Sequence, residues 1–535
     1  MLSLSLGMLA AGVGLFVAAG LARSATEERK GGTLRLSAPA DVDSVDPAVG
    51  YFPRSWMLSY ATCAKLFNYP DAQGAAGTRL VPEVVERYTI SRDQRTYTFE
   101  LRQTFRFHTG APVTAHSFVA AINRVAQPKL ESPATAYMRE IDGVAAVSDG
   151  KAQTISGVRA LGRYRLQIRL TRPVGDLTAR LTMPFFCPIL PGTPIAEIDT
   201  PAGSGPYYVA ERIVNQRIVL KRNRYYRGNR PANVDEVVVT IDELKDCLLA
   251  IEQVTIDYCY LGGGLPAGAL FRELEERHGI NRPGGRFFVS PSLTTSFVAF
   301  NHDRPAFAGP GQIPLKQAIN HAIDRPELTR QLGYLSANRA DQMLPRGLAR
   351  PTSIYPLRGS DYATARRMLA RARNQPKRLV LYANSFSVTV AQAEILAFNL
   401  KQIGIDLQVK YFDIGALPGK LATRGEPYDL ALAGWFADYA DPAAFFVPIL
   451  NRGSGQGVNL DDPRIDARIE AANRLTGEAR RRAAWADLDV DLMRDNPPWA
   501  PYVHTQTRTL VSKGVGCVVV HPLYGFDIAA VCKKR

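Results

Sequence analysis

Arg378-Leu379-Val380-Leu381-Tyr382 and Asp429-Leu430-Ala431-Leu432-Ala433-Gly434-Trp435 are the first and last of three strand patterns that lie close together in the sequence. Between them stand a helix pattern at residues 391–403, another strand pattern at residues 405–409 and a short helix through Leu417 and Leu421. A series that alternates strands with helices is typical of a doubly wound, partly parallel sheet. The stretch therefore predicts an α/β fold.

The helix pattern at residues 391–403 is amphipathic, so one of its faces should cover the predicted sheet. Ile395, Phe398 and Leu400 are the side chains that we expect in the core, and Gly404 ends the helix.

A candidate binding site directly follows the last strand of the series. Trp435 leads into Phe436, Ala437 and Asp438, and ligands of open α/β sheets bind beyond the carboxyl ends of the strands. A carboxylate beside an aromatic ring suits a ligand with an ammonium group, through charge-assisted hydrogen bonds and a cation–π contact. The pattern equally allows a plainer interpretation, in which Trp435 anchors the core and Asp438 is a loop carboxylate.

The first 25 residues are expected to be a signal peptide or an N-terminal anchor. Residues 1–22 are apolar and carry no charge, and small residues at Ala22 and Ser24 permit cleavage near Ala25. No basic residue precedes the apolar run, which is about long enough to span a membrane, so a tethered form is the alternative. No cysteine follows the run, which argues against a lipid anchor.

Six cysteines suit export to an oxidising compartment. Cys517 and Cys532 form the best candidate pair, and Cys247 with Cys259 comes next. Cys63 with Cys187 is the least secure pair. Buried free thiols are the alternative for each pair, and none of the six has the spacing of a metal site.

The chain is basic, with 65 Lys and Arg against 50 Asp and Glu in 535 residues, and its length favours two or three subdomains. A net charge of +15 raises the question of a nucleic-acid or membrane partner. The densest basic groups, at residues 366–378 and 480–482, fall in helical patterns and are expected to be solvated helix faces. No recognised nucleic-acid module accompanies them, so we expect no nucleic-acid partner.

No catalytic motif stands out in the sequence. The seven histidines form no H-E-x-x-H motif, and Gly203-Ser204-Gly205 precedes Pro206 and a strand, unlike the Ser of a nucleophile elbow. We therefore expect neither an enzyme nor a bound metal or cofactor.

Several segments, taken together in their order and spacing, resemble the solute-binding proteins of the oligopeptide, dipeptide and nickel ABC importers (family 5). The resemblance extends over nearly the whole chain after residue 30. It is carried by Gly31-Gly32-Thr33-Leu34, Ser44-Val45-Asp46-Pro47, Tyr97-Thr98-Phe99-Glu100-Leu101-Arg102, Phe107-His108-Thr109-Gly110, Gly203-Ser204-Gly205-Pro206-Tyr207 and Ala318-Ile319-Asn320-His321-Ala322-Ile323-Asp324-Arg325.

The resemblance implies a two-lobed periplasmic-binding-protein fold of type II (cluster C), in which two crossing segments join the lobes and an extra subdomain is inserted. Lobe I would comprise residues 31–47, 199–289 and 496–535. The inserted subdomain would comprise residues 48–198, and lobe II residues 290–495.

The peptide-binding branch of this family has a Trp-x-x-Asp at the end of a strand in lobe II, where the Asp takes the amino terminus of the peptide. Trp435-Phe436-Ala437-Asp438 matches it position by position. In that branch the ligand backbone also pairs like an extra strand. The implied positions here are Gly434 and Phe436, with a loop at residues 50–52 that includes Tyr51 and Phe52.

The implied function is that of an extracytoplasmic receptor, monomeric and on the periplasmic or outer side of the membrane. It would capture an oligopeptide-like ligand between its lobes and deliver it to an ABC permease. A nickel, haem, sugar or opine-like ligand, or a ligand-sensing role, is the alternative within the family. A secreted hydrolase is the least favoured.

Overall fold

The structure is a computed structural model, and it describes residues 28–242, 247–259, 268–349, 352–413, 415–450 and 458–534. The predicted signal peptide or anchor at residues 1–25 lies outside these ranges. No helix within them is long and apolar enough to cross a lipid bilayer.

Lobe I is built on a five-stranded sheet in the order β12-β2-β11-β10-β9. β2 is parallel to β11 and β12, whereas β9, β10 and β11 form an antiparallel meander. Alternate residues such as Leu34, Leu36 and Leu220 are buried, so one face of the sheet forms the core of the lobe. The strands are β2 (Thr33–Ala38), β9 (Tyr207–Ile213), β10 (Arg217–Arg222), β11 (Glu236–Ile241) and β12 (Tyr258–Cys259).

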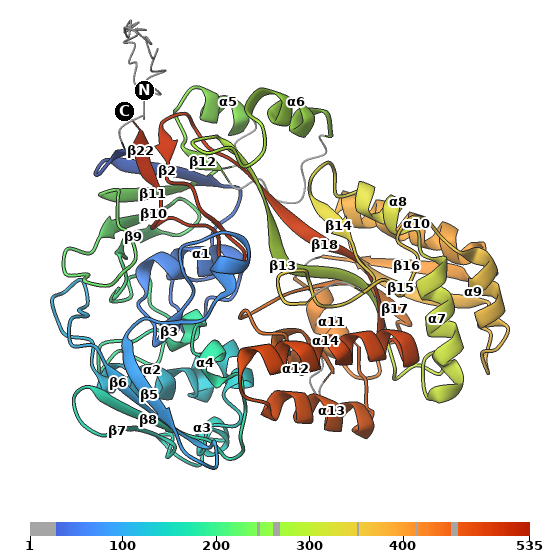
Figure 1. Ribbon diagram of the computed structural model, residues 1–535, viewed down its shortest axis with the longest axis horizontal. Coiled ribbons are helices and arrows are strands. Elements are labelled where there is room, and N and C mark those ends of the chain that lie inside the picture. The colour runs from blue at the N-terminus through green and yellow to red at the C-terminus, as the bar shows by residue number, and fades with distance from the viewer. Residues whose placement is uncertain are drawn as a thin grey trace, which may run out of the picture.

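The first and last described strands lie side by side on lobe I (Figure 1). β1 (Glu28–Arg29) pairs with β22 (Cys532–Lys534), which also pairs with β19 (Val515–Gly516). A short hairpin of β20 (Val520–His521) and β21 (Gly525–Phe526) precedes β22. The helices α5 (Cys247–Glu252) and α6 (Gly268–His278) lie at the same end of the molecule.

The inserted subdomain has an antiparallel sheet in the order β5-β6-β8-β7, and Phe99, Leu166 and Ile168 are buried beneath helix α2. Thr114 caps α2 through a capping box with Ser117, as its position before the helix favours. The main elements are α1 (Pro53–Thr62), β5 (Val85–Ile90), β6 (Thr96–Leu101), α2 (Ala115–Val125), β7 (Val158–Ala160) and β8 (Arg165–Arg169). Shorter ones are β3 (Phe67–Asn68), β4 (Val81–Pro82), α3 (Val144–Ser148) and α4 (Leu177–Arg180).

A buried ion pair ties the inserted subdomain to the Asp-Pro turn of lobe I. The Arg124 guanidinium in α2 donates to both carboxylate oxygens of Asp46, at 3.0 and 2.6 Å, and also to the carbonyl of Pro194 at 2.8 Å. Both side chains are almost fully buried, so each charge depends on the other. Asp46 in the family-like segment is therefore a structural residue.

Lobe II contains a six-stranded sheet in the order β14-β18-β13-β17-β15-β16. β15 is parallel to β16 and β17, as the alternating pattern predicts, whereas β13 and β18 are antiparallel to their neighbours. The strands are β13 (Phe287–Phe300), β14 (Ala337–Arg339), β15 (Arg378–Asn384), β16 (Asp406–Phe412), β17 (Leu430–Phe436) and β18 (Trp499–Leu510).

Helices pack around this sheet (Figure 1), and α10 corrects one prediction. Leu396 and Leu400 of α10 are fully buried, but Phe398 is 61% exposed and is not a core residue. Phe398 follows Leu396 by two residues, about 200° around the helix, which places it on the opposite face. The helices are α7 (Ile313–Ala322), α8 (Arg325–Arg330), α9 (Tyr362–Leu369), α10 (Ser387–Lys401), α11 (Leu417–Ala422), α12 (Ala443–Leu450), α13 (Pro463–Arg474) and α14 (Glu478–Asp495).

The paired strands β13 and β18 run between the two lobes (Figure 1). The predicted boundary at residue 290 falls inside β13, and that at residue 495 falls shortly before β18. The division of the chain at those residues remains a prediction. The names lobe I, inserted subdomain and lobe II serve only as labels for these parts.

The inserted subdomain and lobe II are in direct contact. The hydroxyl of Tyr439 donates to Asp176 at 2.8 Å, the amide of Gly175 donates to the carbonyl of Asn473 at 2.7 Å, and one hydrophobic core contains residues of both parts. The inserted subdomain and lobe II therefore leave no gap between them at these contacts.

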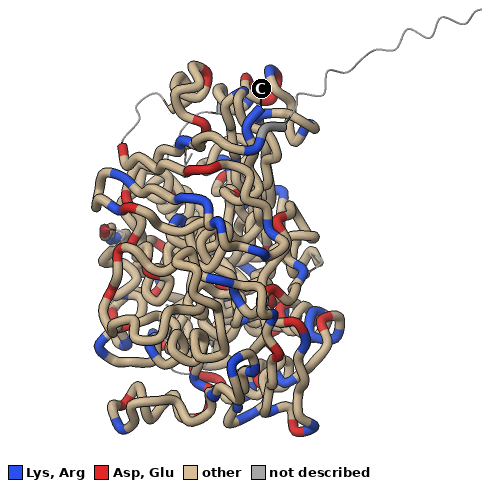
Figure 2. The backbone as a smooth tube through the Cα atoms, turned by 90° about the vertical axis from the view of Figure 1, so that its left-hand side faces the viewer, with Lys and Arg blue, Asp and Glu red and all other residues tan. Residues whose placement is uncertain are grey.

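On the side of lobe I and the inserted subdomain, basic and acidic residues are interspersed along the backbone (Figure 2). The arginines at residues 366–378 are exposed, as predicted. The prediction of a solvated face is wrong for Arg481, which is 3% exposed and donates to both oxygens of Asp441 at 3.0 and 2.8 Å. Arg481 stabilises the turn that follows the candidate site.

All three predicted cysteine pairs are disulfides in the structure. Cys63–Cys187 links residues 124 positions apart and closes nearly the whole inserted subdomain. Cys247–Cys259 and Cys517–Cys532 close segments of 12 and 15 positions in lobe I. The long crosslink lowers the conformational entropy of the unfolded chain more than the two short crosslinks do.

We predict that replacing Cys63 and Cys187 together by Ser lowers the free energy of unfolding by about 2 kcal/mol more than replacing Cys247 and Cys259 together, because the lost chain entropy grows with loop length. Urea denaturation of the two double variants measures the difference. An equal or smaller loss for the Cys63–Cys187 variant contradicts it.

Candidate ligand-binding site

Strand β17 carries the residues of the predicted site to the carboxyl edge of the lobe II sheet. Its first half, Leu430 to Leu432, is buried, whereas Gly434 is exposed and Trp435 and Phe436 are half-buried. The strand thus changes from a core element to a partly open surface just before Asp438.

Among the strands that the structure describes, none pairs with one edge of β17 after its first residues. β15 pairs only with Leu430 and Ala431 and then ends at Asn384, where the chain turns toward helix α10. The other edge stays paired with β13 as far as Phe436. The carboxyl half of β17 therefore offers one open side.

The ladder with β13 shows which main-chain groups face that open side. Asn301 donates its amide to the carbonyl of Asp429 at 3.0 Å, and the amide of Ala437 donates to the carbonyl of Leu293 at 2.8 Å. Main-chain groups of successive residues point to opposite edges. The amides and carbonyls of Gly434 and Phe436 consequently point away from β13, toward the open side.

Asp438 is fully buried and is held by two tyrosines from the inserted subdomain. Its Oδ1 accepts a hydrogen bond from the Tyr51 hydroxyl at 2.8 Å, and its Oδ2 accepts one from the Tyr137 hydroxyl at 2.7 Å. The two hydroxyl oxygens are 3.2 Å apart. This carboxylate therefore bridges lobe II and the inserted subdomain.

Burial raises the pKa of Asp438 from 3.8 to about 7, against the hydrogen bonds from Tyr137, Tyr51 and its own backbone, which lower it. Burial and the same carboxylate raise the pKa of both tyrosines well above their ordinary value. No cation within the described ranges forms an ion pair with Asp438. The site is a buried acid that lacks a positive partner.

Aromatic rings surround the Tyr51 side of this carboxylate. The Tyr51 ring lies 5.8 Å from Trp56, 5.9 Å from Phe185 and 5.8 Å from Phe436, measured between ring centroids. Trp435 stacks on Phe436 at 6.4 Å and donates its indole N–H to the carbonyl of Ala444 at 2.8 Å. Trp435 is thus fixed in place, yet part of its ring remains accessible.

The structure brings Asp438, Tyr51 and Phe436 together but not Phe52. Phe52 stands just before α1, donates its amide to Asp43 and is 58% exposed. Within the described part of the chain its ring contacts none of the rings named above. A role for Phe52 in the site remains a prediction without a supporting contact.

Two residues of the site escaped the sequence analysis. Tyr137 reaches Asp438 across 301 sequence positions from a short 3-10 helix, Pro133–Tyr137, and no local motif marks it. Tyr69 accepts the amide of Ala440 on its hydroxyl at 2.8 Å, again across the two parts of the molecule. Both contacts join segments that are far apart in the sequence, so no local sequence pattern could have indicated either residue.

Within the described residues, no group of three or more His, Cys, Asp or Glu side chains is arranged to hold a metal ion.

Comparison with known proteins identifies the relatives of this chain. Residues 79–457 match the family model of bacterial extracellular solute-binding proteins, family 5. The periplasmic oligopeptide-binding protein OppA of Salmonella typhimurium is 25% identical over 461 residues, which cover 81% of each chain. The nickel-binding periplasmic protein of Escherichia coli is 23% identical and covers 91% of each chain.

Solved structures show the same fold. The clavulanic acid biosynthesis oligopeptide binding protein 2 superposes with a TM-score of 0.82 at 26% identity, over 95% of this chain and 96% of that one. The murein tripeptide binding protein MppA of Escherichia coli gives 0.72 at 22% identity, over 95% and 99% of the two chains. These matches confirm the predicted two-lobed periplasmic-binding-protein fold.

Members of this family are receptors of ABC transporters and have no enzymatic activity, so the prediction that this chain is not an enzyme is also confirmed. Because the family model matches well over half of the sequence, the chain belongs to the bacterial extracellular solute-binding proteins of family 5.

Proposed function

We propose that this receptor captures oligopeptide-like ligands between its lobes and that Asp438 binds their amino terminus. The observation that carries the proposal is a fully buried carboxylate that forms no ion pair with any described residue and lies directly beyond an open strand edge. A buried charge is stable only when it is paired, and a peptide ammonium would supply the missing charge.

The open side of β17 supports a peptide rather than an isolated amine. The main-chain groups of Gly434 and Phe436 face it, and an extended peptide satisfies such groups by adding a strand. A Cβ placed on Gly434 would meet no atom closer than 3.7 Å, so the backbone is also sterically approachable. Trp435, half-buried beside this edge, would cover the first ligand residue.

Tyr51 and Tyr137 would keep Asp438 in place when the ligand arrives. A carboxylate can accept about four hydrogen bonds, so two tyrosine hydroxyls leave room for an ammonium. Entry of a ligand requires the inserted subdomain and lobe II to separate, a hinge motion for which the crossing strands β13 and β18 are placed.

The relatives support the peptide class and the location. OppA and MppA are named for peptide ligands, and both are named periplasmic. Three disulfides also suit an oxidising compartment. We therefore infer an exported receptor that delivers its ligand to an ABC permease. The nickel-binding relative keeps a metal ligand as the alternative.

We predict that Asp438→Asn weakens binding of a free-amino tripeptide such as trialanine by about 2–5 kcal/mol, because it removes the partner of a buried ammonium. N-acetyl-trialanine, which has no ammonium, serves as the matched ligand and should bind both proteins with similar affinity. Isothermal titration calorimetry measures both. Equal affinity of the two proteins for trialanine rules out this role of Asp438.

We predict that trialanine affinity rises with pH between about 5 and 7, by up to about tenfold per pH unit. Without ligand, buried Asp438 keeps its proton up to about pH 7, whereas an ammonium needs the ionised carboxylate, so binding must release that proton. Calorimetry at constant ionic strength checks the trend. The rise should vanish in Asp438→Asn, and a flat profile in the parent protein would contradict the assignment.

We predict that N-methylation of a single ligand amide weakens binding by about 0.5–1.5 kcal/mol where that amide pairs with β17, because one main-chain hydrogen bond is lost. A set of trialanines methylated at one amide each can be compared by competition binding. At least one position should be sensitive, and uniform tolerance of methylation would exclude strand addition.

A further inference from the structure

A hollow that is distinct from the Asp438 site is lined by residues of lobe I and the inserted subdomain. It encloses about 1080 Å³, which is at the upper end of the range for small-molecule sites. None of the residues that line it comes from residues 290–495, and Gly434 to Asp438 are not among them. The hollow is therefore formed without residues of lobe II and is separate from the Asp438 site.

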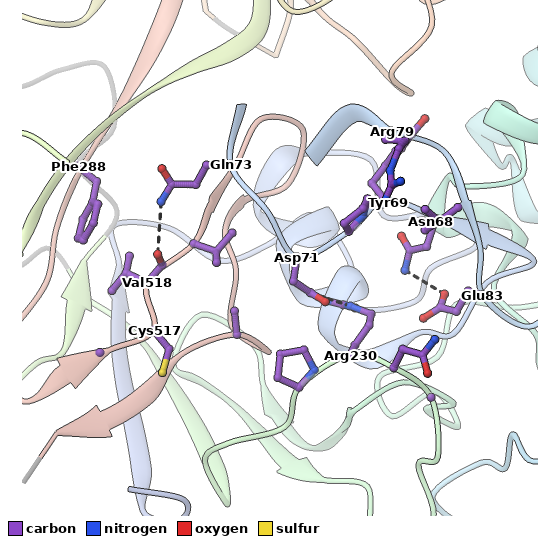
Figure 3. A pocket seen from close by; sticks show the side chains of 18 of the residues that line it. Asn68, Tyr69, Asp71, Gln73, Arg79, Glu83, Arg230, Phe288, Cys517 and Val518 are labelled. Atoms are coloured by element: carbon purple, nitrogen blue, oxygen red, sulfur yellow. Dashed lines mark hydrogen bonds and ion pairs between the residues drawn. The ribbon is translucent and has the colours of Figure 1, made fainter. Parts of the chain in front are cut away.

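Part of the hollow is a rigid wall of paired charges (Figure 3). The Arg230 guanidinium donates to Asp71 at 2.6 Å and lies 3.6 Å above the centre of the Tyr60 ring. Glu83 accepts from the side-chain amide of Asn68 at 2.9 Å. Asp71 and Glu83, the two acidic residues that line the hollow, thus each have a hydrogen-bond donor within the protein.

The remaining charges of the hollow are all positive. Six basic residues line it, and Arg79, Arg102, Arg227 and Arg282 are exposed. In the part of the chain that the structure describes, none of these four forms an ion pair with a carboxylate. Arg227 donates only to main-chain carbonyls, those of Arg224 and Tyr226 at 2.8 Å each.

These arginines come from separate segments. Arg79 and Arg102 belong to the inserted subdomain, Arg227 follows β10, and Arg282 precedes the crossing strand β13. Phe105 and Phe288 also line the hollow. A ligand with more than one negative charge would gain more from these separate guanidinium groups than a ligand with a single charge.

We propose that this hollow, which we call the arginine pocket, is a second binding site and that its ligand is a small anion with two or more acidic groups. Guanidinium groups bind phosphate and carboxylate through paired, charge-assisted hydrogen bonds. The Arg230–Asp71 ion pair supplies one wall of the pocket without using the other arginines. Neither binding of a peptide at Asp438 nor opening of the lobes is required for this site to be filled.

The test is calorimetric titration of the purified full-length chain with two polyanions, inorganic tripolyphosphate and N-acetyl-triglutamate. The acetyl group removes the ammonium that Asp438 would bind, and the two probes distinguish a phosphate ligand from a carboxylate ligand. We expect saturable binding of at least one probe with one site per chain. Absence of saturable binding for both overturns the proposal.

Variants locate the site. The double variant Arg79→Gln with Arg102→Gln should lower the affinity for the probe by about tenfold or more, since charge-assisted hydrogen bonds are lost. Arg165→Gln with Arg371→Gln removes the same charge from exposed arginines outside the pocket and should change the affinity little. Asp438→Asn should also leave it unchanged. A single Arg282→Gln gives a second route to the same result.

Two results contradict the arginine pocket. One is undiminished affinity in both the Arg79–Arg102 double variant and Arg282→Gln. The other is equal weakening in the Arg165–Arg371 control, which would reveal general attraction to a basic protein. Thermal melting of each variant confirms that it is folded before it is titrated.

Discussion

The carboxylate of Asp438 is completely removed from water and is held by two phenol hydroxyls from another part of the molecule. Burial of an acid without a cation is unfavourable, and the protein responds by raising the pKa of the group to about 7. The contact between lobe II and the inserted subdomain is therefore linked to the charge state of one side chain. A ligand with a positive charge would therefore shift the protonation of Asp438 more than a neutral ligand would.

The architecture places that carboxylate and prepares its surroundings. β17 lies between β13 and β15, but β15 ends early and leaves the carboxyl half of β17 open on one side. Arg481 fixes the turn beyond Asp438 by binding Asp441, and Trp435 is fixed by its hydrogen bond to Ala444. Main-chain groups for a strand, an aromatic surface and a buried acid consequently meet within five residues of sequence. This is the combination that a receptor for extended, free-amino ligands needs.

The local part of this site could be predicted from the sequence, and the long-range part could not. The apolar run at residues 429–435 predicts β17, which the structure places at Leu430–Phe436, and the Trp-x-x-Asp pattern marks Asp438. Tyr137 has no such pattern, because its role depends on a contact between distant segments. Phe398 and Arg481 show the limit of helical patterns, since Phe398 lies on the face of α10 opposite the buried Leu396, whereas Arg481 lies on the buried face of α14 and pairs with Asp441. The sequence predicts all three cysteine pairs but leaves free thiols as the alternative for each, because a disulfide also requires a short distance between Cα atoms, such as 5.8 Å for Cys63 and Cys187.

The most direct test of the account is a crystal structure of the protein in complex with trialanine. The account predicts that the ammonium lies within hydrogen-bonding distance of Asp438, and that the peptide backbone extends along the open side of β17 and pairs with Gly434 and Phe436. A ligand bound elsewhere, with Asp438 still held only by Tyr51 and Tyr137, would contradict the central claim.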